Sequence, residues 1–160
     1  MAFHDDLLKQ AFDLVRKNSA NPTQADLRRS VSSAYYALFH LLISETTAHW
    51  NLDNSRPGLA RMFEHSLMKK ASARISDSKL FPFTGEDPKV VERLVRVAQA
   101  FGRLQDMRHV ADYDNATHWG QVEAESEVET AERAFSDWSA VKQEKIAQDY
   151  LVSLLIKPRG

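Results

Sequence analysis

The chain contains no cysteine, and glycine and proline number only five each among its 160 residues. The absence of cysteine excludes disulfide bonds, thiolate zinc sites and cysteine nucleophiles. With 43% apolar residues, the chain is long enough for one compact core and too short for two domains of ordinary size. We therefore expect a single domain over residues 1–160.

Long apolar runs and an excess of positive charge are also missing. There is no apolar segment of 18 residues and no apolar stretch after a basic N-terminus, which argues against membrane spanning and secretion. The 21 lysines and arginines nearly balance the 22 acidic residues, so no global field attracts nucleic acid or an anionic membrane. We expect a cytoplasmic protein without a membrane partner, in which any RNA or nucleotide contact is local.

Metal and cofactor signals are weak. The six histidines include no pair at the i,i+4 spacing that builds a helical zinc site. The chain has no glycine-rich phosphate loop, no G-x-S-x-G elbow and no strand-helix unit to carry either. We therefore predict no metal and no cofactor.

Apolar periodicity predicts helices along most of the chain and no strand. The predicted helices cover residues 5–17, 23–48, 59–75, 88–113 and 121–143, and residues 146–156 either extend the last helix or form a separate one. Thr23 and Asp26 form a variant capping box at the start of the second helix. Loops are predicted at residues 51–58 and 76–87, where prolines and glycines gather.

The fourth predicted helix carries an apolar stripe that ends in two charges. The stripe consists of Val90, Leu94, Val97, Phe101 and Leu104. Arg108 and Asp112 continue it within the same sector of the helix, so both side chains point toward the core and stand one turn apart. Two interpretations remain open: a paired charge at a site, or a core that ends at Leu104 with a solvated ion pair.

The second predicted helix has an unusual polar stripe without lysine or glutamate. Its members are Asp26, Arg29, Ser33, Tyr36, His40 and Ser44. If this stripe faces Arg108, Asp112 and the adjacent His109, the two helices form a polar cleft. Arginine, tyrosine, serine and histidine together suit a phosphate-bearing ligand. The alternatives are a core or interface histidine at position 40 and ordinary aromatic packing at Tyr36.

Two segments resemble the HEPN domain family. Residues 32–40, SSAYYALFH, resemble its S-x-A-Y-Y-A-x-F-H helix, and residues 108–113, RHVADY, resemble the R-x-x-A-D-Y signature of one branch. The segments lie about 70 residues apart in the expected order, and residues 124–138 resemble the helix that usually follows. The resemblance spans residues 5–142. It implies an all-α, up-and-down bundle of four to five helices, with residues 146–160 as a C-terminal helical extension, commonly paired as a homodimer with a polar cleft near the two-fold axis.

Many HEPN proteins are metal-independent ribonucleases with an R-x(4–6)-H motif, from which this chain departs. No histidine stands in that register after Arg108. Arg103 and His109 have the spacing, but Leu104 replaces the usual polar residue and the two side chains point about 120° apart on a straight helix. Proton transfer would therefore need His40 or His109.

The resemblance leaves three functions. The first is a nucleotide- or RNA-binding component of a toxin-antitoxin or defence-type system. The second is a ribonuclease toxin. The third is a structural dimerisation domain or an accessory subunit of a nucleotidyltransferase; in the latter case Tyr113 would be a candidate acceptor of the group that the partner transfers. The candidate catalytic residues are Arg108, His109 and His40. The candidate ligand-binding residues are Arg29, Ser33, Tyr36, Asp112, Tyr113 and Arg103, and Arg61 could join Arg29, Arg103 and Arg108 in a basic rim.

Overall fold

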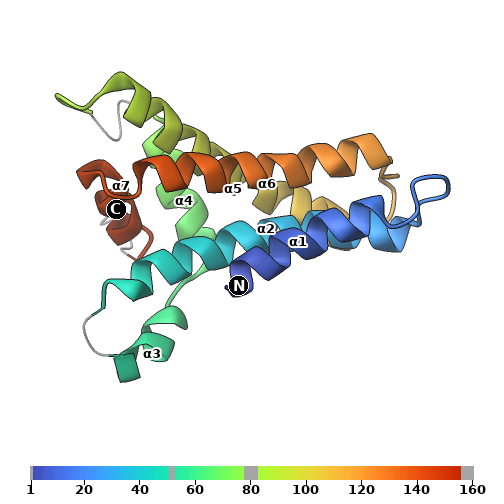
Figure 1. The fold of residues 1–160 in the computed structure, drawn as a ribbon, viewed down its shortest axis with the longest axis horizontal. Coiled ribbons are helices and arrows are strands. Elements are labelled where there is room, and N and C mark those ends of the chain that lie inside the picture. Colours follow the sequence, from blue (N-terminus) through green and yellow to red (C-terminus); the bar gives the residue numbers. More distant parts are fainter. Residues whose placement is uncertain (1, 51–52, 78–82, 156–160) are drawn as a thin grey trace.

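The structure is a computed structural model that describes residues 2–50, 53–77 and 83–155. These residues form seven α-helices and one 3-10 turn, without any strand, which confirms the all-α prediction (Figure 1). The elements are α1 (Phe3–Arg16), α2 (Gln24–Ala48), the 3-10 turn η1 (Asp53–Ser55), α3 (Arg56–Ala60), α4 (His65–Ser76), α5 (Pro88–Tyr113), α6 (Gln121–Val141) and α7 (Lys145–Ser153). The four longest helices match the predicted ranges closely.

The third predicted helix, over residues 59–75, is wrong as a single element. The short α3 begins inside the predicted loop and ends at Ala60, and the chain becomes helical again as α4 at His65. The break is marked by Glu64, whose backbone is extended (φ −117°, ψ 128°). It leaves Phe63 buried and the neighbouring Met62 68% exposed, so the apolar spacing of this region reflects two elements. Residues 51–52 and 78–82 of the predicted loops lie outside the described residues.

The C-terminal region resolves the alternative left open at residues 146–156. A turn after Val141 separates α6 from α7, so the second option, a separate helix, is confirmed over its described part. Two fully buried hydroxyls join α7 to α4, because Tyr150 and Ser72 lie 2.7 Å apart. Helix α7 thus packs on α4 and on α2.

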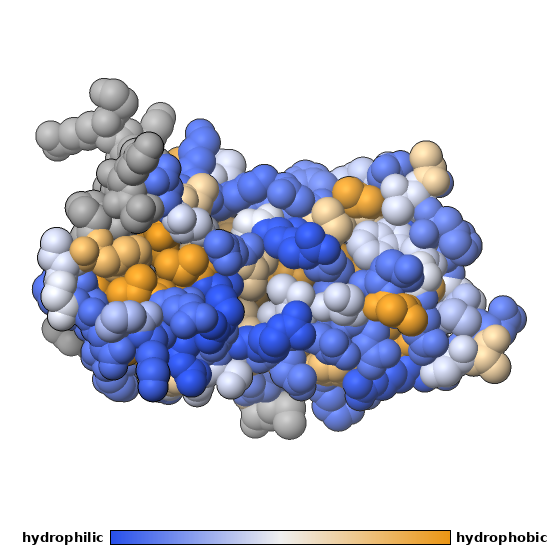
Figure 2. Space-filling model, turned by 90° about the horizontal axis from the view of Figure 1, so that it is seen from above, coloured by the Kyte–Doolittle hydropathy of each residue, from blue (hydrophilic) through white to orange (hydrophobic). Residues whose placement is uncertain are grey.

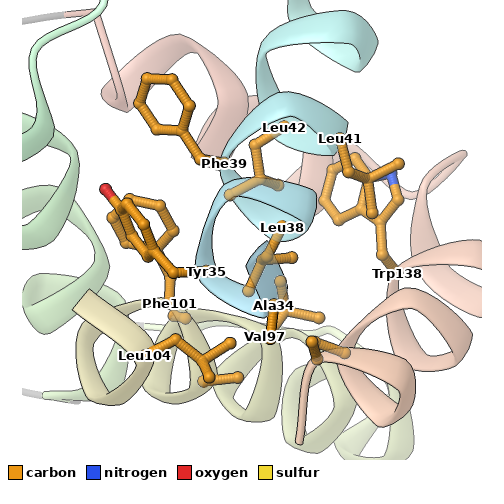
Figure 3. Close-up of a cluster of buried hydrophobic side chains, with 14 of the residues drawn as sticks. Ala34, Tyr35, Leu38, Phe39, Leu41, Leu42, Val97, Phe101, Leu104 and Trp138 are labelled. Carbon is orange, nitrogen blue, oxygen red and sulfur yellow. The ribbon is translucent and has the colours of Figure 1, made fainter. Parts of the chain in front are cut away.

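Helix α2 lies at the centre of the fold, in contact with α1, α5 and α6 (Figure 1). Its buried residues face two sides: Leu41 lies near Trp138 of α6, whereas Tyr35 lies beside Phe101 of α5 (Figure 3). A helix that packs all round must place some polar residues against neighbours, and α2 also buries three serines. Its start is capped as predicted, since the Thr23 side chain accepts a hydrogen bond from the amide of Asp26 at 3.1 Å.

The outer surface is mixed in character. On the face shown in Figure 2, hydrophilic residues surround separate apolar patches, as expected of amphipathic helices around a core. Among the helices described, none combines the length and apolar character needed to cross a bilayer.

The connection between α5 and α6 is held by two side chains from the first turns of α2. The guanidinium of Arg28 donates to the carbonyls of Ala111 and Asp114, both at 2.9 Å, and to that of Thr117. The amide of Gln24 bonds both the carbonyl and the amide of Trp119, at 2.7 and 3.0 Å. These contacts fix the last turns of α5, which carry Arg108 and Asp112, against α2.

Candidate functional site

Arg108 lies nearly buried between α5 and α2, with 9% of its surface exposed. Its Cζ atom stands 5.2 Å from the ring centre of Tyr35 and 5.6 Å from that of Tyr36. Its Nη1 donates to the Tyr36 hydroxyl at 3.3 Å. The charge therefore continues the core-facing stripe, and the alternative in which the core ends at Leu104 with a solvated pair is wrong for the arginine.

The predicted partner of Arg108 is present but holds it loosely. Asp112 Oδ2 lies 3.7 Å from Nη1 and is shared with Ser32, whose hydroxyl donates to the same oxygen at 3.4 Å. Among the described residues no acceptor bonds the buried Nε of Arg108. A guanidinium has five donors, so this one retains unused hydrogen-bonding capacity and positive charge.

His109 is the histidine that adjoins the guanidinium. Its Nε2 lies 3.4 Å from Nη2 of Arg108, and its side chain is exposed. Tyr113, one turn further along α5, is 70% exposed, and its ring centre is 5.8 Å from that of His109. His109 and Tyr113 thus lie on the solvent-exposed side of Arg108.

The structure adds Tyr35 and His65, neither of which was among the predicted site residues. The Tyr35 hydroxyl is hydrogen-bonded to Nδ1 of His65, the first residue of α4. Burial raises the pKa of Tyr35 well above its ordinary value, and the nearby charge of Arg108 only partly opposes this rise. The hydroxyl therefore stays protonated, and the tautomer of a neutral His65 decides whether the hydroxyl donates to Nδ1 or accepts from it.

Several forces keep His65 neutral. Burial lowers its pKa first, followed by repulsion from Arg108, His40 and His109. Its ring stacks on Phe39 with centres 4.2 Å apart. Phe39 belongs to the predicted motif helix, but no periodic pattern links that helix to position 65, so only the packing of α4 against α2 and α5 reveals the contact.

The predicted polar stripe of α2 does not form one cleft. Tyr36 reaches Arg108, but the buried Ser33 faces α1, where its hydroxyl donates to Gln10 Oε1 at 3.1 Å, so the structure does not bring Ser33 and Arg108 together. Arg29 is exposed, and over the described ranges it makes no polar contact with Arg108. His40 packs against Phe3 at 4.8 Å between ring centres, and burial followed by repulsion from His4 lowers its pKa.

Arg103 is held away from the site by an acid on α6. Its guanidinium forms two hydrogen bonds with the carboxylate of Glu127, one at 3.1 Å, and Glu127 is buried. Residues five apart point about 140° from each other on a helix, so Arg103 and Arg108 face different neighbours. The structure therefore places Arg103 apart from Arg108.

Comparison with protein-family models, curated proteins and solved structures found no match to this chain. The HEPN resemblance accordingly stays a prediction from its two motifs. Within residues 2–50, 53–77 and 83–155, no group of three or more His, Asp or Glu side chains is arranged to hold a metal ion.

The arrangement suits recognition of an anion that presents two oxygens side by side to the guanidinium. An arginine whose guanidinium lies against two aromatic rings is preorganised, so it loses little side-chain entropy when it binds a phosphate through two parallel hydrogen bonds. The exposed imidazole of His109 adjoins the same guanidinium, with Nε2 at 3.4 Å from Nη2, so it lies within reach of the same ligand.

Proposed function

We propose that this chain is a HEPN-like domain that binds a phosphate-bearing ligand, RNA or a nucleotide, at Arg108. The observation that carries the proposal is the state of this arginine: it is nearly buried, it lies against two tyrosine rings, its carboxylate partner is 3.7 Å away, and one of its nitrogens is unbonded. Burying a charge without full compensation costs stability. A ligand that supplies the missing negative charge offsets that cost.

The spatial meeting of the two motifs supports the same proposal. Tyr36 and Ser32 belong to the S-x-A-Y-Y segment, and they contact Arg108 and Asp112 of the R-x-x-A-D-Y segment. Residues from two segments about 70 positions apart in the sequence thus contact the same ion pair. In this proposal the domain acts as a homodimer within a toxin-antitoxin or defence-type system, where a nucleotidyltransferase is a candidate partner.

Metal-independent RNA cleavage is the second candidate function, and one contact favours it. His109 combines exposure with a 3.4 Å approach to Arg108, whereas His40 lies against Phe3. In such a reaction Arg108 would stabilise the charge that develops on the phosphate, and His109 would transfer the proton. Of the two histidines, His109 is therefore the stronger candidate.

The test compares Arg108→Lys with a matched control on the same helix. Arg93→Ala also alters an α5 arginine, but Arg93 is half-exposed and its partner Asp137 keeps two hydrogen bonds from Arg96. Binding of a labelled RNA and of nucleotides is measured by fluorescence anisotropy. We expect Arg108→Lys to weaken binding at least about tenfold, because lysine lacks the planar fork, while Arg93→Ala has little effect.

Cleavage is tested in EDTA with the same RNA, read for 2′,3′-cyclic phosphate ends. Products that disappear in His109→Ala and in Arg108→Lys would establish the ribonuclease function. If a folded Arg108→Lys variant binds RNA and nucleotides as the unmodified chain does, the binding proposal is wrong. The pair with Asp112 would then have a structural role, such as fixing helix register in a dimerisation domain.

A further inference from the structure

An exposed aromatic side chain stands at the end of a path that leads to Arg108. Phe3, the first residue of α1, is 60% exposed, and its ring meets His40 edge-on with centres 4.8 Å apart. The centres of His40 and Tyr36 are 6.5 Å apart, and the Tyr36 ring lies 5.6 Å from Cζ of Arg108. A chain of neighbouring aromatic rings therefore links the exposed Phe3 to the guanidinium.

The His40 ring in this path behaves as a neutral aromatic surface. It is partly buried among Phe3, Phe39 and Tyr36, and the direction of its pKa shift favours the uncharged form. The exposed phenyl ring of Phe3, set edge-on against this neutral imidazole, offers aromatic area on which a nucleobase can stack.

The overall charge narrows the kind of nucleic acid that such a surface fits. Binding to a duplex depends mainly on many contacts between cations and phosphates, and this chain has a formal net charge of −1. One preorganised arginine next to aromatic rings is instead the combination that holds a single strand, because unpaired bases stack on aromatic side chains.

We propose that Phe3 and His40 form a base-stacking subsite, so that the ligand is a single-stranded nucleic acid whose phosphate lies on Arg108 and whose neighbouring base lies on these rings. This inference rests on the proposed function and specifies its substrate class. The alternative is that a second copy of the chain covers the exposed Phe3 ring, and the test below distinguishes this subunit contact from nucleic-acid binding.

The experiment uses a labelled, unstructured RNA of about 12 nucleotides, alone and annealed to its complement. Phe3→Leu keeps an apolar side chain but removes the ring, Phe3→Trp keeps a ring, and Val122→Ala is the control. Val122 is also an exposed apolar residue in the first turn of a helix, at 79% exposure. Phe3 is exposed, so its replacements leave the core intact.

We expect the single strand to bind at least about tenfold more tightly than the duplex. Phe3→Leu should weaken single-strand binding by roughly 5- to 100-fold, the range for loss of one stacked base, and Phe3→Trp should preserve it. Val122→Ala should bind as the unmodified chain does. A single-stranded DNA of the same sequence should show the same dependence on Phe3, because stacking does not require the 2′-hydroxyl.

Two results would overturn the subsite while leaving the proposed function intact. One is full binding by Phe3→Leu alongside weakened binding by Arg108→Lys, and the other is equal affinity for strand and duplex. If Phe3→Leu instead converts a dimer to a monomer in sedimentation without changing RNA affinity, Phe3 belongs to a subunit interface. Absence of RNA binding by the unmodified chain would remove both the subsite and RNA as the ligand.

Discussion

Replacing Arg103 with alanine is expected to destabilise the fold without weakening binding at Arg108. Glu127 has a side chain only 4% exposed, and it receives both of its hydrogen bonds from the Arg103 guanidinium. Removing the arginine leaves a carboxylate buried without its partner, which is the unfavourable way to break an ion pair.

The magnitude follows from how exposed each partner is. Breaking a fully buried pair costs about 3–5 kcal/mol. Because the Arg103 side chain is 58% exposed, water can partly replace it, and we expect a loss of about 2–3 kcal/mol in the free energy of unfolding. For a chain of this length such a loss lowers the melting temperature by about 4–12 °C.

Thermal and urea unfolding measure this loss, and a second substitution checks its cause. Glu127→Gln in the Arg103→Ala background removes the stranded charge, so the double variant should recover about 1–2 kcal/mol of the loss. RNA affinity of the folded Arg103→Ala variant should equal that of the unmodified chain. Unchanged melting, or a loss of affinity as large as that of Arg108→Lys, would refute this assignment of Arg103.

Three further predictions concern groups outside the Arg103–Glu127 pair. Arg28→Met should cost about 2–4 kcal/mol in urea unfolding and raise hydrogen exchange at residues 114–119, because three charge-assisted bonds to carbonyls are lost; unchanged exchange there would contradict the clamp. Ser72→Ala should lower the free energy of unfolding by about 1–3 kcal/mol, because it leaves the buried Tyr150 hydroxyl without a partner. Tyr150→Phe should lower it by only about 1 kcal/mol, because the Ser72 hydroxyl keeps its bond to a carbonyl at 2.8 Å. Equal costs would argue against an arrangement in which Tyr150 donates to Ser72 and Ser72 donates to that carbonyl. His65 has a folded-state pKa below the ordinary 6.5, so the unfolded chain takes up its proton first and stability falls as pH drops below that value. The melting temperature should therefore fall more between pH 7.5 and 5.5 in the unmodified chain than in His65→Asn, and an equal fall would exclude this contribution.

Local patterns were enough to predict the four longest helices and one feature of the site. Helix ranges, the Thr23 cap and the Arg108–Asp112 pair depend on residues within one or two turns of each other. The direction of Arg108 was also predictable, since it continues the periodicity of a stripe that ends at the buried Leu104.

The remaining site residues depend on which helix faces meet, and only the tertiary structure decides this. Ser33 shares a helical stripe with Tyr36, yet α1 covers Ser33 while α5 covers Tyr36. Arg103 turns to Glu127 because α6 packs against α5 on that side. His65 joins Arg108 through Tyr35 only because the break after Ala60 redirects the chain and starts α4 beside α2. The sequence by itself therefore determined the four longest helices and the charge that ends the α5 stripe, whereas long-range packing selected the partners of that charge.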